Sequence, residues 1–202
     1  MGRQFDENVG MKRLLLADEV TRSAVEAELL GSGWRHVPST NKMTEVIRYK
    51  SSWIDAHGTD VANYLENTPL ACSYVLVTEN ASARLHTAFS RRGWVLEAQQ
   101  VLDHSWSDDA DALRTIGRLG LLSHGDFDAK IFAKLSALLL HPNQAWRRFA
   151  LYALSNTSWD AYGLVVRKAI SEGLYAEGLA GEAEALVRDL EAGNWNDDLY
   201  KE

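Results

Sequence analysis

The chain has 202 residues, of which 28 are Asp or Glu and 21 are Lys or Arg, so its formal net charge at pH 7 is −7. This acidic balance disfavours proteins that grip nucleic acid or an anionic membrane surface, because both tasks need a positive surface. The hydrophobic share of 46% and the charged share of 24% are those of an ordinary globular protein with one or two domains.

The single cysteine and the polar N-terminus favour a reducing compartment. Cys72 has no second cysteine with which to form a disulfide, a cysteine zinc site or a CxxC redox pair. No stretch approaches the roughly 18 consecutive apolar residues of a membrane span. Residues 1–8 are polar where a signal peptide would be apolar. We therefore expect a cytoplasmic protein without a membrane partner.

The first half of the chain contains an internal repeat with an offset of 60 residues. Residues 14–19 align with residues 74–79, and Gly33-Trp34 aligns with Gly93-Trp94. Each copy is predicted to form a strand, a helix that ends at the glycine, and a second strand. Two such βαβ halves in one domain are typical of a ferredoxin-like sandwich.

Residues 44–50 separate the two copies and mix β-branched, aromatic and charged residues, as an edge or solvated strand does. Together these elements predict an α+β domain of ferredoxin-like type over residues 1–106. The pattern over residues 14–102 also resembles the ribonuclease-regulator B type of small α+β domain. That resemblance implies two halves that pack together and bind an enzyme.

From Ser107 onward, apolar residues recur with the helical period of 3.6, and almost no strand signal remains. The clearest helix follows His141-Pro142-Asn143, where proline ends one helix and the asparagine side chain can cap the next. Two further helices are predicted upstream, over residues 112–122 and 128–140, and two downstream. This pattern predicts a second, all-α domain of five helices over residues 107–202.

The helical half carries a weak repeat of 33 residues, the step from Arg114 to Arg147. Residues 138–154, with the sequence LLLHPNQAWRRFALYAL, resemble one unit of the HEAT-repeat proteins. In that family a leucine-rich helix, a Pro or Asp turn and a helix with an early arginine follow one another. The resemblance implies stacked helical hairpins with a concave protein-binding surface. The chain departs from the family pattern at Asn143, where aspartate is usual, and at Ala180, which replaces the repeated arginine.

The sequence carries no recognised catalytic or cofactor motif. GxGxxG, GxxxxGK[ST], GxSxG, HExxH and CxxC are all absent, and no two of the six histidines have the spacing that binds a metal from one helical face. We therefore predict no catalytic residues, no cofactor and no metal site. His57 to Asp60 and His124 to Asp128 each combine histidine with carboxylate in a turn, as acid–base pairs do. Asp60, Asp126 and Asp128 are more simply interpreted as helix caps or dipole partners.

The combination of a small acidic chain, a repeat scaffold and no catalytic signature is similar to that of bacterial toxin-immunity proteins. This resemblance implies a stoichiometric inhibitor, not an enzyme, that binds a basic protein such as a toxin. Aromatic and acidic residues of the second half are the candidates for partner binding, although the two aromatic ones are also candidates for the core. The five residues are Asp126, Asp128, Trp159, Asp160 and Tyr162.

Two other functions stay open. Small HEAT-like folds include an alkylpurine DNA glycosylase family, whose members need a basic groove, and the second half contains enough cations for a local positive stripe. The chain is equally compatible with a regulator or scaffold of an endogenous enzyme. The cations that would form the stripe are Arg114, Arg118, Lys130, Lys134, Arg147, Arg148, Arg167 and Lys168.

Overall fold

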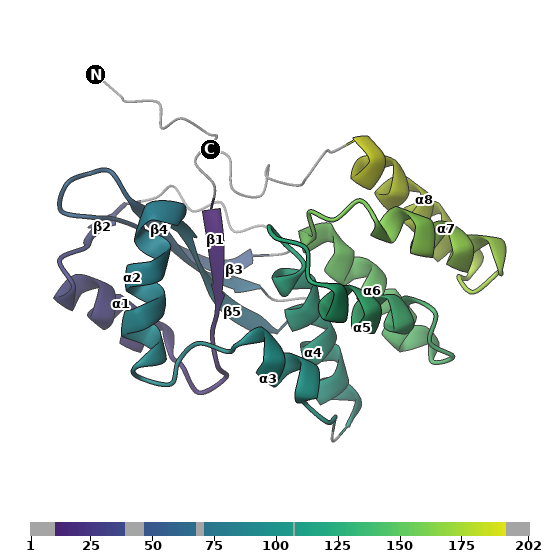
Figure 1. Cartoon of the computed structure of the whole chain (residues 1–202), viewed down its shortest axis with the longest axis horizontal. Coiled ribbons are helices and arrows are strands. Elements are labelled where there is room, and N and C mark those ends of the chain that lie inside the picture. The colour runs from purple at the N-terminus through teal and green to yellow at the C-terminus, as the bar shows by residue number, and fades with distance from the viewer. Residues whose placement is uncertain (1–10, 39–46, 68–70, 107, 193–202) are drawn as a thin grey trace. The chain divides into compact units, whose positions relative to one another are not determined.

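The computed structural model describes residues 11–38, 47–67, 71–106 and 108–192. The chain divides into two compact units, Met1–Leu96 and Glu97–Glu202, which are coloured in sequence order in Figure 1. The division lies ten residues before the predicted boundary between residues 106 and 107, because a short helix after Leu96 packs with the helices that follow it. Strands occur in the first unit and helices dominate the second, so the predicted α+β class is confirmed.

In its described residues, the first unit contains one antiparallel sheet and two helices. The sheet order is β1-β5-β4-β3-β2, and an isolated bridge between Leu16 and Val95 adds an extended segment beside β1. The segment predicted as an edge or solvated strand falls partly on β3. Strand β3 lies between β2 and β4, but β2 pairs only with residues 52–54, so among the described strands residues 47–50 have β4 as their one neighbour. Residues 44–46 lie outside the described part. In chain order the elements are β1 (Met11–Leu15), α1 (Arg22–Gly31), β2 (Arg35–Val37), β3 (Ile47–Ile54), β4 (Val61–Asn67), β5 (Cys72–Thr78) and α2 (Glu79–Ser90).

The 60-residue repeat is visible in the backbone of this unit. Each copy runs from a strand into a helix and then through a glycine with positive φ, +84° at Gly33 and +71° at Gly93. The next residue in each copy is a tryptophan whose backbone N–H donates to a carbonyl in the preceding helix, at 3.0 Å in both cases. Glycine is needed there because a left-handed backbone is costly for residues with a Cβ atom.

The strands of the two copies pair with local two-fold symmetry. Leu14 lies opposite Val75, and Leu15 lies opposite Tyr74, in the antiparallel pair of β1 and β5. The 60-residue offset converts each of these pairs into the other. The copies differ in the second extended segment: Val95 lies beside β1, whereas β3 and β4 separate β2 from β5.

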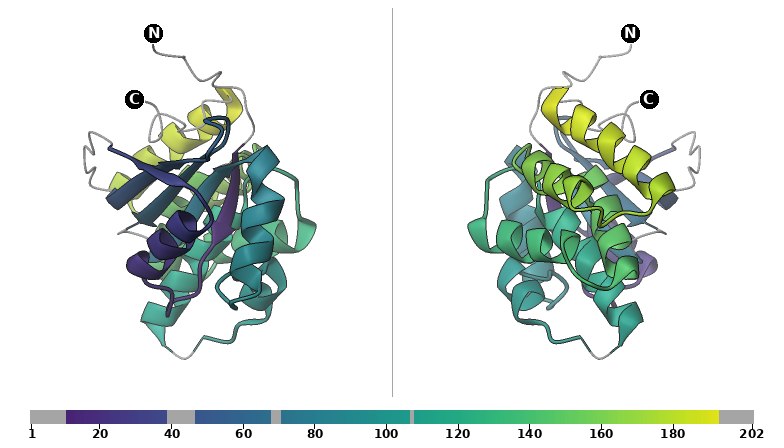
Figure 2. Two further views of the ribbon diagram at one scale, coloured as in Figure 1. Left: turned by 90° about the vertical axis from the view of Figure 1, so that its left-hand side faces the viewer. Right: turned by 90° about the vertical axis from the view of Figure 1, so that its right-hand side faces the viewer.

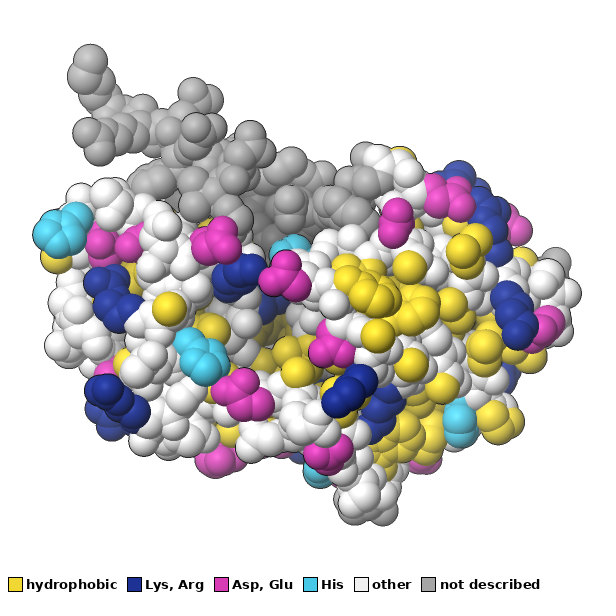
Figure 3. Space-filling view, in the orientation of Figure 1, with side chains coloured by type: hydrophobic (Ala, Val, Ile, Leu, Met, Phe, Trp, Pro, Cys, Tyr) yellow, Lys and Arg dark blue, Asp and Glu magenta, His cyan; other side chains and the backbone are white. Residues whose placement is uncertain are grey.

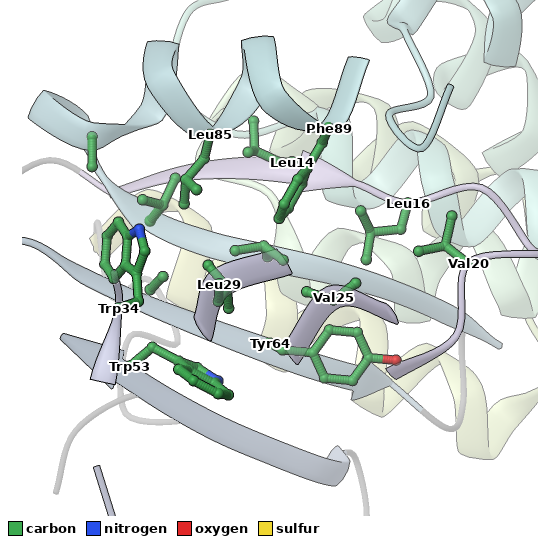
Figure 4. Close-up of a cluster of buried hydrophobic side chains, with 14 of the residues drawn as sticks. Leu14, Leu16, Val20, Val25, Leu29, Trp34, Trp53, Tyr64, Leu85 and Phe89 are labelled. Carbon is green, nitrogen blue, oxygen red and sulfur yellow. The ribbon is translucent and has the colours of Figure 1, made fainter. Parts of the chain in front are cut away.

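Helices α1 and α2 cover one face of the sheet (Figure 2, left) and enclose the core of this unit. Helix α1 contributes Val25 and Leu29, and α2 contributes Leu85 and Phe89, each pair at helical spacing. They pack against large side chains of the sheet and its edges, including Trp34, Trp53 and Tyr64 (Figure 4). This apolar cluster explains why both helices keep an apolar stripe in the sequence.

The second unit is a helical array, seen from one side in Figure 2, right. All five predicted helices are present, preceded by one additional short helix. The helices pack as three successive hairpins, α3 with α4, α5 with α6 and α7 with α8, and the packing of α3 on α5, α5 on α7 and α4 on α6 joins neighbouring hairpins. The elements are α3 (Ala98–Asp103), α4 (Asp109–Leu122), α5 (Ala129–Leu139), α6 (Gln144–Ala153), the 3₁₀ turn η1 (Leu154–Asn156), α7 (Tyr162–Ser171) and α8 (Glu177–Ala192).

The turn between α5 and α6 follows the capping prediction. The side chain of Asn143 accepts hydrogen bonds from the backbone N–H groups of Ala145 and Trp146, at 2.9 and 3.4 Å. Arg147 donates to the backbone carbonyls of His141 and Pro142, at 2.6 and 2.9 Å. The arginine thus stabilises the turn through backbone oxygens.

Candidate protein-interaction surface

The five candidate residues lie around two neighbouring connections of the helical unit. The first connection, residues 123–128, joins α4 to α5, and we call it the Phe127 loop. The second, residues 157–161, joins η1 to α7. Hydrogen bonds tie the connections together, because the backbone N–H of Ser158 donates to the carbonyl of Ser123 at 3.0 Å and the hydroxyl of Ser158 accepts from the N–H of Gly125 at 2.9 Å. Candidates separated by more than 30 residues therefore lie close together.

Trp159 and Tyr162 are core residues in this arrangement, with exposed fractions of 5% and 0%. The indole N–H of Trp159 donates to the carbonyl of Gly125 at 2.9 Å. The hydroxyl of Tyr162 lies 3.0 Å from that of Ser123, and burial raises the pKa of Tyr162 to about 12. The structure thus places Trp159 and Tyr162 in the core, the alternative that the sequence also offered for them, where their hydrogen bonds stabilise the two connections.

Phe127, which the sequence did not single out, is the exposed member of the same group of rings. We define the aromatic cluster as Phe127, Phe132, Trp159 and Tyr162. The centroid of the Phe127 ring lies 4.9 Å from the ring centroid of Trp159 and 5.4 Å from that of Phe132. The ring centroids of Phe132 and Tyr162 are 4.8 Å apart. Even so, 57% of Phe127 remains exposed. The available signal was its position between two aspartates in a predicted turn, because connecting segments usually run over the surface.

Three carboxylates accompany the exposed ring, and we call them the acidic rim: Asp126, Asp128 and Asp160. Asp128 is the N-cap of α5, as predicted, and its Oδ1 accepts from the backbone N–H groups of Lys130 and Ile131. Asp126 is exposed and does not occupy the cap position. Asp160 is also exposed and follows Trp159 directly. The surface thus combines one large apolar group with negative charge.

On a larger scale, hydrophobic side chains gather on the face of the helical unit that Figure 3 presents, over the region of α5 and α6. Exposed apolar area of this kind marks interaction surfaces when it is contiguous and bordered by polar groups. Single exposed apolar residues, such as Leu164 on α7 with an exposed fraction of 75%, are ordinary by comparison.

The other stretch that combines histidine with carboxylate forms the turn between β3 and β4. The carboxylate of Asp55 is buried and accepts hydrogen bonds from the N–H groups of Thr59 and Asp60, at 2.8 and 3.2 Å. Burial alone would raise the pKa of Asp55, but these hydrogen bonds outweigh it and lower the pKa. Asp60 caps no helix; it accepts from the hydroxyl of Thr78 at 2.8 Å. The carboxylates of Asp55 and Asp60 therefore stabilise this turn by accepting hydrogen bonds.

Most of the cations considered for a positive stripe are engaged within the helical unit. Arg118 is buried in α4. Arg167 forms a bidentate pair with Glu191 on α8, with donor–acceptor distances of 2.6 to 2.9 Å. Four further cations have partners in the unit: Lys134 with the carbonyl of Leu102 and the ring of Trp106, Arg147 with two turn carbonyls, Arg148 with the hydroxyl of Tyr152, and Lys168 with Glu172.

A shallow groove of about 440 Å³ runs between α7 and α8, with Arg167 and Arg188 on its sides and Ile170 and Val187 among its lining. Glu191 pairs with Arg167, and Glu184 lines the groove together with Arg188, so the groove offers little net charge to an anion. Within the described ranges, no three His, Cys, Asp or Glu side chains converge as a metal site would require. In the same ranges, no helix is long and apolar enough to cross a membrane.

No model of a known protein family matches this chain, and searches of curated proteins and of solved structures found no similar protein.

Proposed function

We propose that this protein is a protein-binding inhibitor that acts in the cytoplasm, of the kind represented by bacterial immunity proteins. It forms a stoichiometric complex with a basic protein, such as a toxin, through the Phe127 loop and the acidic rim. The observation that carries this proposal is the ring of Phe127, which is more than half exposed although it is fixed by contacts with two other rings.

A fixed aromatic residue is well suited to anchor a protein complex. Aromatic side chains dominate the binding energy of many interfaces, where a few anchors each contribute about 2 kcal/mol or more. The Phe127 loop is held by the hydrogen bonds of Gly125 with Trp159 and Ser158 and by the capping of α5 by Asp128. Binding therefore requires little additional ordering of this loop, which favours affinity.

The acidic rim complements the anchor. Asp126 and Asp160 are exposed, and the chain as a whole has a net charge of −7. Exposed charge of one sign steers an oppositely charged partner and raises the association rate more than it raises affinity. A basic partner fits this surface better than a neutral or an acidic one.

The proposed architecture agrees with this function. In the first unit, setting aside the β3–β4 hairpin leaves the order Val95 segment, β1, β5, β2, which supports a ferredoxin-like sandwich with one hairpin inserted. In the second unit, three successive hairpins and the 33-residue step from Gly120 to Ala153, residues in close approach, support a HEAT-like array. Arrays of this kind serve as protein-binding scaffolds.

The alternative functions receive less support. A glycosylase-like protein needs free cations along a groove, whereas seven of the eight candidate cations are buried or already engaged. A regulator of an endogenous enzyme would use the same surface as an immunity protein. Genomic neighbourhood separates those two functions, because an immunity gene is expected directly beside the gene of a large toxin.

The proposal is tested by capture of the partner from native cells, or with the product of the neighbouring gene, followed by an assay of the captured protein. We expect the captured partner to lose its activity. Phe127→Ala should weaken capture by about 30-fold or more, which corresponds to about 2 kcal/mol. Leu164→Ala removes a comparably exposed apolar side chain and should change capture less than about three-fold.

Circular dichroism establishes that both variants are folded before they are compared. A partner that stays fully active in the complex contradicts the inhibitor proposal. Equal capture by the wild type and Phe127→Ala removes the Phe127 loop from the interface.

A further inference from the structure

We infer that the Phe127 loop occupies the cleft in which its partner holds nucleic acid, so that the partner is a nucleic-acid-binding enzyme and inhibition is competitive with its substrate. This inference rests on the proposed function and specifies the partner's chemistry. It follows from the combination of an exposed flat ring with flanking carboxylates, and neither feature alone would carry it.

Carboxylates precede and follow the exposed ring in the chain. Asp126 and Asp128 flank Phe127 on both sides in the chain, and their Cα atoms are at most about 7 Å apart. Both capping hydrogen bonds of Asp128 go to Oδ1, so its second oxygen remains available for an external contact. Asp160 adds a third carboxylate next to Trp159, whose ring touches that of Phe127. The exposed ring thus has a carboxylate on each side in the chain and a third next to the tryptophan that it contacts.

An aromatic ring with neighbouring negative charges is recognised by the same chemistry that recognises a nucleotide. A single-stranded nucleic acid presents the same two elements, a flat aromatic base and the negative charges next to it. Proteins hold it with a cationic groove and with aromatic or arginine side chains that stack on the base, at about 1 to 3 kcal/mol per base. A purely apolar pocket would bind Phe127 poorly, because the carboxylates would lose water without gaining a cationic partner.

The ring of Phe127 is held in position by its contacts with other rings. Trp159 and Phe132 hold the ring of Phe127 from within the unit, and Gly125, with φ of +76°, sets the course of the loop before it. The ring is therefore presented outward without a cost in ordering, as a competitor of a flexible nucleic acid strand requires.

Displacement from the captured complex tests the inference. The protein is immobilised with its captured partner and challenged, at constant ionic strength, with a single-stranded oligodeoxythymidylate or with polyglutamate of equal charge. We expect the oligonucleotide to release half of the partner at a charge concentration at least ten-fold lower than polyglutamate needs. Polyglutamate supplies charge without rings, so the difference isolates the aromatic contribution.

Charge-neutral variants provide the matched comparison. Asp126→Asn with Asp128→Asn removes two charges while keeping a good helix cap, because asparagine caps as well as aspartate. This double variant should release its partner at an oligonucleotide concentration about ten-fold lower than the wild type needs. Asp189→Asn, at an exposed position on α8, should behave as the wild type.

Three results would overturn the inference: no release by either polyanion, equal release by both, or an oligonucleotide that binds the complex without displacing the partner. Equal behaviour of the double variant and Asp189→Asn would overturn it as well. These outcomes leave the inhibitor function intact, since a partner has been captured and inactivated. Failure to capture any partner contradicts the proposed function and this inference together.

Discussion

Tyr162 and Phe127 belong to one aromatic cluster but meet different surroundings. Tyr162 has no exposed surface and uses its hydroxyl within the core. Because the single hydroxyl hydrogen of Ser123 is donated to the carbonyl of Leu119 at 2.8 Å, the Tyr162 hydroxyl donates to Ser123. Phe127 belongs to the same cluster through its contact with Trp159, but 57% of its surface is exposed. Within one aromatic cluster, Tyr162 therefore stabilises the core, and Phe127 is the residue proposed to bind the partner.

Tyr162→Phe tests the structural part of this division. The substitution removes one buried hydrogen bond while Ser123 keeps its bond to Leu119, so we expect a loss of about 0.5 to 1.5 kcal/mol in the free energy of unfolding. Urea denaturation measures the loss, and partner capture should stay within about two-fold of the wild type. A capture defect as large as that expected for Phe127→Ala would show that Tyr162 is itself part of the interface.

Helices α4 and α6 approach each other closely where Gly120 faces Ala153. A Cβ atom added at Gly120 would lie 2.4 Å from the carbonyl oxygen and 2.7 Å from the Cβ of Ala153. The glycine in α4 is thus required by packing between helices and not by its own backbone conformation. The contact lies in the last turn of α4, which ends at Leu122 directly before the Phe127 loop.

Gly120→Ala is therefore expected to destabilise the protein. Separation of the two helices should cost about 1 to 3 kcal/mol, as overpacking of a core does. Gly181→Ala in α8 is the matched control, because its added Cβ has no neighbour within 4 Å. This control should be neutral or stabilising by up to about 1 kcal/mol, since alanine is the better helix former. Urea denaturation compares the two variants, and equal effects would contradict the close approach.

Among the described residues of the two units, three tyrosines have a pKa raised to about 12: Tyr64 in the first unit, and Tyr162 and Tyr175 in the second. Burial is the main cause at each position, because it disfavours the tyrosinate anion. At Tyr64 the nearby carboxylate of Glu66 adds to the effect, and the hydrogen bond with Ser73 opposes it. Both units therefore carry alkali-sensitive core groups.

Stability should consequently fall as the pH rises from 10 to 12. Below pH 10 these tyrosines are protonated in both folded and unfolded chains, so they cause no pH dependence. Above pH 10 the unfolded chain releases their protons first, which favours unfolding by up to about 1.4 kcal/mol per pH unit for each tyrosine. Urea midpoints at several alkaline pH values, with the ultraviolet absorbance of tyrosinate, measure the effect. Ordinary titration of all tyrosines near pH 10 in the folded protein would contradict it.

The sequence by itself determined the features that depend on near neighbours in the chain. The helix caps of Asn143 and Asp128, the glycine turns at Gly33 and Gly93, and the five helices of the second half follow from local hydrogen bonds and from the apolar period. These interactions span only a few residues, so their signals are complete within a short window of sequence.

Only the tertiary structure decided the features that depend on residues far apart in the chain. The hairpin of β3 and β4 lies between β5 and β2 because strand pairing is chosen among distant segments. Trp159 and Tyr162 have equally aromatic neighbours in Phe127 and Phe132, so composition alone could not tell which ring would be exposed. The contacts between the two connections bury Trp159 and leave Phe127 exposed, since exposure is a property of the space around a side chain.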